Sequence, residues 1–331
     1  MATIRLSALT RAVMATAVMM MACASGPTLV PEATIDALGL HSLPVELCVY
    51  EGAVIRAFIL GDPEAPRRYI FIHGWAGSGA EFLQLAEALT LEDQGAAIWC
   101  IDLPGSGSSD KPAGAAYDLP FFRGAIRSVV ETVSRSSKSS MPGADPPEII
   151  LAGHSLGGHF VIDYMVHDGT LVDRLVLLAP AGWPGESGIP GVWASGSGAI
   201  TDIALAFITE DTYIAGVQNR VLFDPAKFPE ASARYAGIYL ATPDGKAALK
   251  AVTLNALEHD TIEGSLNAIT VPVFLAWGRN DRILPYRYAQ LFLAALPPGT
   301  VFMEFDRCGH TPHVEYPQEL AAAIAKNGIV R

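Results

Sequence analysis

Positive charge and cysteine are both scarce in this chain, and their scarcity excludes several classes of function. Lys and Arg number 22 against 34 Asp and Glu, so the net charge is −12 at pH 7, and no long basic run offsets it. A nucleic-acid-binding surface needs such a basic patch, so no nucleic-acid partner is expected. The 331 residues include four cysteines, at no spacing that suggests a zinc site. We therefore expect no metal and no other cofactor.

Long apolar runs are also missing, and the one candidate lies at the N-terminus. Residues 12–22 are apolar and rich in Met and Ala, but this run is too short to span a bilayer as a mature helix. Arg5 and Arg11 precede it as a positive segment, and Ala22-Cys23-Ala24 fits a small-x-small cleavage site. Residues 1–23 are therefore interpreted as a secretory signal peptide, followed by a surface tether over residues 24–40.

The cleavage region leaves two interpretations open. The sequence Met-Met-Ala-Cys at residues 20–23 resembles a bacterial lipobox, in which Cys23 carries the lipid after cleavage, although Leu is more usual at the position of Met20. In the other interpretation the signal is removed and Cys23 is incidental. Both predict a location in a bacterial cell envelope. The protein is either tethered to the membrane through lipidated Cys23, or periplasmic or secreted.

Apolar runs of strand length alternate with helical segments along most of the chain. Residues 45–50 and 54–60, separated by Glu51-Gly52, predict an antiparallel hairpin. Further strands are expected at residues 68–72, 96–101, 148–152, 175–178, 271–277 and 301–305. This alternation predicts an α/β fold with a mostly parallel, eight-stranded sheet that is wrapped by helices.

The alternation stops over residues 181–269, where no strand pattern is found. Helical pieces are expected around residues 203–207, 228–240 and 247–257. So long a stretch without a strand, inside a sheet protein, indicates an inserted helical cap rather than a loop. The predicted core therefore consists of residues 41–180 and 270–331, and the predicted cap of residues 181–269.

A serine lies in a sharp turn directly after one buried strand. Residues 153–158 read Gly-His-Ser-Leu-Gly-Gly, which puts Ser155 in the pattern Gly-x-Ser-x-Gly at the start of a helix. The pattern alone is common, so partners for the serine are needed. A serine hydroxyl becomes a nucleophile only when a base takes its proton and a third group orients that base.

Two such partners follow later strands at their carboxyl ends, where open α/β sheets place their sites. Asp281 lies in the turn after residues 271–277, and His310 lies in the loop after residues 301–305. Glu186 is a weaker alternative to Asp281 as the acid. His313 is a weaker alternative to His310 as the base.

Five ordered motifs now give the chain a specific resemblance. They are the elbow at residues 153–158, His73-Gly74 after a strand, Asp-x-x-Gly-x-Gly-x-Ser at residues 102–109, the turn at residues 278–281, and Gly-His-x-Pro-x-x-Glu-x-Pro at residues 309–317. With the order Ser155, Asp281, His310, the chain resembles α/β-hydrolase fold enzymes of the capped lipase, esterase and haloperoxidase-like group. The resemblance covers roughly residues 45–326 and leaves the cap unspecified.

The resemblance implies a role for each of these residues. Ser155 attacks an acyl carbonyl, His310 is the general base and then the general acid, and Asp281 orients the imidazole. The backbone N–H groups of Leu156 and Trp75 form the oxyanion hole, and water then cleaves the acyl-enzyme. The expected function is hydrolysis of a small or medium apolar ester.

Other interpretations remain open beside this one. The same triad would serve a carbon–carbon bond hydrolase or a cofactor-free perhydrolase, and a catalytically silent hydrolase-fold protein would bind a ligand or partner instead. His159, Asp163 and His167 share one helix face, which is more often a polar helix edge than a metal site. Asp102 is expected to fix its loop rather than to react.

Overall fold

The computed structural model describes residues 30–40, 42–135, 145–183, 202, 205–256, 262 and 264–329. The predicted signal peptide and Cys23 lie outside the described residues, as does Glu186 of the predicted cap.

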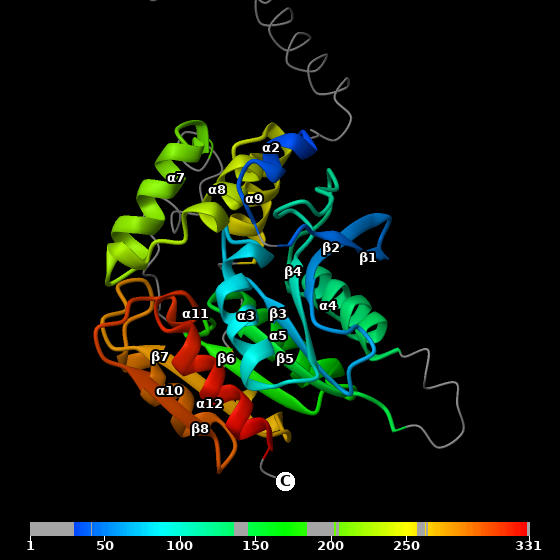
Figure 1. Cartoon of the computed structure of the whole chain (residues 1–331), viewed down its shortest axis with the longest axis vertical. Helices are drawn as coiled ribbons and strands as arrows, with labels where there is room; N and C mark the ends of the chain where they lie inside the picture. Colours follow the sequence, from blue (N-terminus) through cyan, green and yellow to red (C-terminus); the bar gives the residue numbers. More distant parts are fainter. Residues whose placement is uncertain are drawn as a thin grey trace, which may run out of the picture.

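Eight strands form one sheet in the order β1-β2-β4-β3-β5-β6-β7-β8 (Figure 1). The strands are β1 (Val45–Tyr50), β2 (Ala53–Leu60), β3 (Arg67–Ile72), β4 (Ala96–Asp102), β5 (Glu148–His154), β6 (Arg174–Leu178), β7 (Val273–Gly278) and β8 (Val301–Phe305). β2 pairs antiparallel with both β1 and β4, and every other pairing is parallel. The predicted eight-stranded, mostly parallel sheet is therefore confirmed.

The direction in which successive strands are added to the sheet reverses at β3. This strand lies between β4 and β5, so the chain leaves β3 for a neighbour on one side and then crosses to a neighbour on the other. In open α/β sheets, ligands bind beyond the carboxyl ends of the strands at such a reversal. The loops that follow β3 and β5 begin there.

Helices cover both faces of the sheet. The main ones are α3 (Leu83–Glu92), α4 (Leu119–Ser134), α5 (Leu156–Asp168), α10 (Arg287–Ala295) and α12 (Pro317–Ile329), with the short η1 (Gly79–Phe82) and α11 (Pro312–Glu315). α3 and α12 lie on one face, and α4, α5 and α10 lie on the other (Figure 1). Along β3 the side chains alternate between the two faces: Tyr69 and Phe71 pack with the first pair of helices, Ile70 and Ile72 with the second group.

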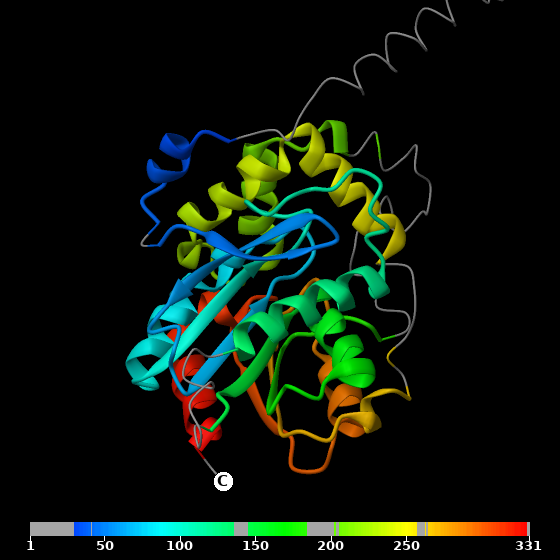
Figure 2. The same ribbon diagram turned by 90° about the vertical axis from the view of Figure 1, so that its right-hand side faces the viewer.

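A group of helices separates β6 from β7 in the sequence. It comprises α7 (Glu210–Gly216), the π-helical turn η3 (Val217–Val221), the short η4 (Pro225–Lys227), α8 (Glu230–Leu240), α9 (Pro243–Asn255) and η5 (Leu266–Ala268). Figures 1 and 2 place α7, α8 and α9 beyond one end of the sheet. α7 was not predicted from the sequence, although Thr209 and Thr212 form a capping box at its start.

Part of the predicted tether packs onto the fold. Residues 32–36 form α2 (Glu32–Asp36), and Ile35 is buried, at 5% exposed, in the cluster that also contains α3 and α12. Across the described ranges, no helix is both long enough and apolar enough to cross a membrane.

Candidate active site

Ser155 stands at the turn between β5 and α5. Its backbone angles, φ 52° and ψ −121°, lie outside the regions that a residue with a side chain normally occupies. Such a conformation costs roughly 1–3 kcal/mol and persists only where neighbours impose it. Backbone hydrogen bonds to the end of β6 and to the loop after it hold this conformation. The Ser155 N–H donates to Leu178 O at 3.0 Å, and the Ala181 N–H donates to Ser155 O at 2.8 Å. The strained turn exposes the hydroxyl at the carboxyl edge of the sheet.

Glycines around Ser155 let separate backbone segments meet. A Cβ atom on Gly157 would lie 2.3 Å from His73 O and 2.4 Å from Ile72 O. One on Gly153 would lie 2.5 Å from Gly157 O. Cβ atoms do not approach backbone oxygens so closely, so only glycine lets the first turn of α5 pack against the end of β3. Packing therefore explains the glycines of the Gly-x-Ser-x-Gly pattern.

His310 and Asp281 are joined by a buried hydrogen bond. His310 Nδ1 donates to Asp281 Oδ2 at 2.7 Å, and the two side chains are 5% and 0% exposed. The other carboxylate oxygen, Oδ1, accepts from the N–H groups of Ile283 and Leu284 at 2.8 Å each. Because the carboxylate only accepts, it keeps the ring proton on Nδ1. The Nε2 of His310 is then free of a proton and able to take one up.

Ser155 lies near this pair without being bonded to it. Among the residues that the structure describes, no hydrogen bond joins Ser155 Oγ to His310. The residue before the serine, His154, has its ring centroid 4.8 Å from that of His310, and its Nε2 donates to His310 O at 3.1 Å. Bonds between a nucleophile and its base are often long in ligand-free enzymes and tighten when substrate binds. The structure thus brings Asp281 and His310 into contact and Ser155 into their neighbourhood.

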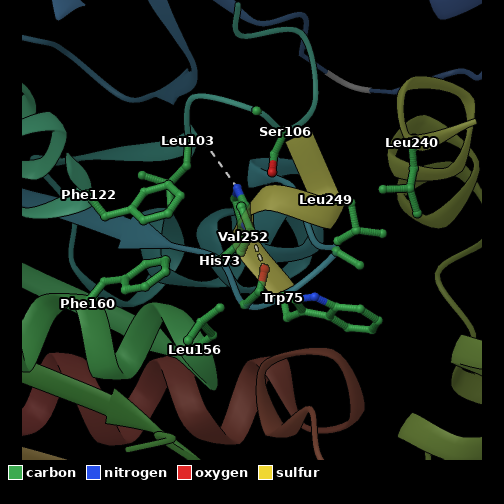
Figure 3. A pocket seen from close by; sticks show the side chains of 13 residues that line it. His73, Trp75, Leu103, Ser106, Phe122, Leu156, Phe160, Leu240, Leu249 and Val252 are labelled. Carbon is green, nitrogen blue, oxygen red and sulfur yellow. Dashed lines mark hydrogen bonds between the residues drawn. The ribbon is translucent and has the colours of Figure 1, made fainter. Parts of the chain in front are cut away.

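The loop after β3 carries Trp75, the first predicted oxyanion donor. His73 Nε2 accepts from the Leu103 N–H at 3.2 Å, so the ring proton lies on Nδ1, which donates to Gly74 O at 2.8 Å (Figure 3). In a planar trans peptide the C=O and the N–H point in opposite directions, so fixing Gly74 O also fixes the Trp75 N–H. A Cβ on Gly74 would lie 3.0 Å from Ser155 Cβ, so this peptide passes beside the serine.

Leu156, the second predicted donor, is the first residue of α5. The first N–H groups of a helix have no intrahelical acceptor, and they form the positive end of its dipole. An oxyanion on a substrate held at Ser155 would meet such donors. Both predicted donors are thus next to the serine, one in the following residue and one in the loop against its Cβ.

Asp102, fully buried at the end of β4, holds the adjacent loop. Its Oδ1 accepts from the Gly79 N–H at 2.8 Å and its Oδ2 from the Ser108 N–H at 2.8 Å. The hydroxyl of Tyr235, in α8, also donates to Oδ2, at 2.5 Å. Burial and the nearby carboxylate raise the pKa of Tyr235 well above its ordinary value, so the phenol stays a donor. The carboxylate therefore ties the inserted helices to the core.

Glu315 holds the loop that carries His310. Its Oε1 accepts from the Gly309 N–H at 2.6 Å, and its Oε2 accepts from the two N–H groups of residues 223–224 at 3.0 Å each. The His310 N–H donates to Val221 O, in the π-helical turn, at 2.8 Å. The backbone of the candidate base is thus fixed from the core and from the insertion together.

An apolar pocket lies between the loop after β3 and the inserted helices (Figure 3). Trp75 Nε1 donates to Thr253 Oγ1 of α9 at 2.9 Å, which anchors one wall. His73 and Ser106 are the polar side chains of the lining. The remaining lining residues are Gly74, Trp75, Ala76, Leu103, Gly105, Phe122, Leu156, Phe160, Leu240, Leu249 and Val252.

The model of the alpha/beta hydrolase family matches residues 69–323, which is most of the chain. This chain belongs to the alpha/beta hydrolase family. The predicted family and the predicted hydrolase activity are thereby confirmed.

Proteins similar to this hydrolase include curated relatives and solved structures. The AB hydrolase superfamily protein YisY of Bacillus subtilis (strain 168) is 27% identical over 263 residues, covering 78% of this chain and 91% of that protein. The pimeloyl-[acyl-carrier protein] methyl ester esterase of Nitrosomonas europaea is 26% identical over 269 residues, covering 77% of this chain and 93% of that protein. A bacterial membrane phospholipase A has a TM-score of 0.68 at 22% identity, covering 96% of this chain and 98% of that one, and shares its fold.

The alternative base of this hydrolase, His313, faces a carboxylate other than Asp281. His313 is fully buried, and its Nε2 faces Glu81 Oε1 at 3.6 Å rather than Asp281. Glu186 is outside the described residues. Asp163, which was expected to lie on a polar helix edge, forms an ion pair with Arg123 of α4, whose Nε lies 2.8 Å from Asp163 Oδ2.

A cluster that the sequence analysis missed lies beside His310. His154 Nδ1 is 2.9 Å from Glu81 Oε1, and His313 Nε2 is 3.6 Å from the same oxygen. Burial, together with the nearby His313, lowers the pKa of His154 to about 4. Burial alone raises the pKa of Glu81, but the attraction of the two histidines outweighs it and brings that pKa below its ordinary range. Glu81 and His154 are far apart in the sequence, so no sequence pattern pointed to this cluster.

Proposed function

We propose that this chain is a serine esterase that hydrolyses a small or medium apolar carboxylic ester through an acyl-enzyme on Ser155. The observation that carries the proposal is the buried hydrogen bond of 2.7 Å between His310 and Asp281, at the sheet edge where the strained Ser155 stands. Such a pair keeps a proton-accepting imidazole nitrogen available close to the hydroxyl.

Each step uses one of these groups. Ser155 Oγ attacks the ester carbonyl carbon while His310 Nε2 takes the hydroxyl proton, and Asp281 stabilises the imidazolium that forms. The N–H groups of Leu156 and Trp75 stabilise the oxyanion. The bond to the alcohol then breaks as His310 returns the proton to it. Water, deprotonated by the same imidazole, attacks the acyl-enzyme and releases the acid and the free serine.

The lining of the pocket supports a substrate with an apolar acyl or alcohol group. It touches both predicted oxyanion residues, Leu156 and Trp75, and neither Lys nor Arg occurs in its described lining. A pocket with mostly apolar walls and a few polar groups gains affinity from apolar area. The relative that is a methyl ester esterase supports the ester class.

An acyl-length series of nitrophenyl esters tests the proposal, run beside a fluorophosphonate probe. Wild type should hydrolyse the shorter esters and take up the probe, and Ser155→Ala should do neither. The control Ser128→Ala, at a partly buried serine of α4, should do both. Ester hydrolysis that survives Ser155→Ala would defeat the mechanism. A diketone or peroxide turned over in place of the esters would favour the carbon–carbon or perhydrolase alternative. No labelling and no turnover would favour a binding protein.

We also propose that Cys23 carries a lipid and tethers the enzyme to a membrane of the bacterial envelope. The support is the Met-Met-Ala-Cys sequence after the apolar segment at residues 12–22. Labelled palmitate should enter the wild type and not Cys23→Ser. Equal incorporation in both, or none in either, would leave a cleaved and secreted protein.

A further inference from the structure

In its neutral form, the histidine next to the candidate nucleophile faces two acceptors with one proton. His154 Nε2 donates to His310 O at 3.1 Å, so the proton of the neutral ring lies on Nε2. The other nitrogen, Nδ1, lies 2.9 Å from Glu81 Oε1. A neutral imidazole carries one N–H, so at this contact a nitrogen lone pair faces a carboxylate oxygen. Two lone pairs at that distance repel each other unless a positive group lies between them.

His313 adds a second unsatisfied group to the same place. Its side chain is fully buried, and neither ring nitrogen finds a hydrogen-bond partner in the part of the chain that the structure describes. An unpaired buried polar group costs about 1–3 kcal/mol. The ring cannot turn away easily, because its centroid lies 4.8 Å from that of Phe82 and 4.5 Å from that of His154. Its Nε2 remains 3.6 Å from Glu81 Oε1.

We infer that Glu81, His154 and His313 form a binding site for a divalent cation of the zinc class. One ligand atom from each residue lies within 4.8 Å of the others, and two of the separations are 2.9 and 3.6 Å. Zinc bonds of about 2.0–2.2 Å in a tetrahedron place ligands roughly 3.3–3.6 Å apart, so the 2.9 Å contact would open slightly and the third separation, at most 4.8 Å, would close. A bound cation would replace the missing proton between His154 and Glu81 and satisfy His313.

The chemistry of the three ligands favours zinc over magnesium or calcium. Two imidazole nitrogens and one carboxylate form a donor set typical of zinc, whereas magnesium and calcium select oxygen ligands. The second nitrogen of His154 already donates to a backbone carbonyl, as metal-bound histidines usually do. The Glu81 side chain is 19% exposed, which leaves one side open for a water as fourth ligand.

The cation would act on the candidate active site through the backbone. It would join η1, the end of β5 and α11, and through His154 it would hold His310 O, the carbonyl of the candidate base. The expected effect is therefore on stability and on the positioning of His310. Metal binding is measured directly, so a failure of the cation site would be distinguishable from a failure of the ester chemistry.

Metal analysis of the full chain, purified without a histidine tag, tests the site. Chelator-stripped protein should take up one zinc per chain, melt at a higher temperature with zinc, and give the visible absorption of four-coordinate cobalt when Co²⁺ is added. Substoichiometric zinc together with an unchanged melting temperature would overturn the inference.

Single substitutions locate the binding. His313→Gln and Glu81→Gln should weaken zinc binding by more than the roughly 10- to 100-fold that loss of an outer-shell partner causes. The control His167→Gln, at a half-exposed histidine of α5, should bind as the wild type does. If a ligand variant fails to fold, the cobalt spectrum of the wild type still decides between a nitrogen-ligated site and none. Zinc binding that is equal in His313→Gln and wild type would place the ion elsewhere and refute the site.

Discussion

The substitution Asp281→Asn separates the orienting role of this side chain from its structural role. Asp281 Oδ1 accepts from two backbone N–H groups, those of Ile283 and Leu284. These donors require an acceptor, so they would hold the asparagine carbonyl at the position of Oδ1. The asparagine NH₂ must then replace Oδ2 and face His310 Nδ1. Two donors cannot bond to each other, so the ring proton would move from Nδ1 to Nε2.

A proton on Nε2 removes the lone pair that should accept the serine proton. In a serine protease triad, the equivalent change lowers kcat roughly 10,000-fold, or about 5.5 kcal/mol of barrier. We expect a loss of that order for Asp281→Asn, with KM little changed. The variant keeps its hydrogen bonds, so its free energy of unfolding should change by no more than about 1 kcal/mol.

Steady-state hydrolysis of a nitrophenyl ester measures kcat, and ¹⁵N NMR of the histidine side chains reports the ring tautomer. Asp306→Asn is the matched control, because it removes one negative charge from an 83% exposed side chain in the same region. A kcat for Asp281→Asn within about tenfold of wild type, worth about 1.4 kcal/mol, would refute the role of His310 as a base oriented by Asp281.

Two further substitutions test the packing of Gly157 against β3 and the charge of Glu148 at the start of β5. Gly157→Ala should lower the free energy of unfolding by about 1–3 kcal/mol, because its Cβ would meet backbone oxygens at the end of β3, while Gly216→Ala, in open space, should not. Urea unfolding compares them, and equal stability would contradict the close approach. Burial alone raises the pKa of Glu148, but hydrogen bonds from Arg174 and Arg67 outweigh this effect and lower the pKa. The ionised Glu148 side chain therefore stabilises the fold above about pH 4.3, and this stabilisation is lost as the pH falls toward the pKa of the folded state. Glu148→Gln should therefore lower the melting temperature at about pH 7 and much less at about pH 3; an equal decrease at both would contradict the assignment.

Strand positions were predictable because buried parallel strands are continuous apolar runs. The deviations have local causes. The strand expected over residues 271–277 begins at Val273, after Pro272, which has no N–H for the ladder. The helix expected over residues 247–257 begins earlier, at Pro243, where Thr242 caps it and the proline suits the first turn. Outside the sheet no such periodicity guides the assignment, and α7 was missed there.

The candidate site was predictable to the extent that the sheet determines it. Ser155, Asp281 and His310 each follow a strand, and a parallel sheet gathers those strand ends at one edge. The directions of side chains within loops are not set by the sheet. Glu81 and His154 are 73 residues apart, and their contact depends on how η1 packs beside the elbow. Sequence periodicity carries no information about such a contact, so the candidate cation site could be found only in three dimensions.

The inserted helices are part of the candidate active site as well as a cover for it. Three separate loops at the sheet edge each depend on one of their groups. The Tyr235 hydroxyl donates to the buried carboxylate of Asp102 at the end of β4. The Thr253 hydroxyl accepts a hydrogen bond from the indole of Trp75, and Val221 O accepts one from the His310 N–H. Losing the last of these contacts would leave the buried His310 N–H unpaired, at a cost of about 1–3 kcal/mol. A rigid-body displacement of the insertion would therefore break contacts that hold the loops carrying Asp102, Trp75 and His310.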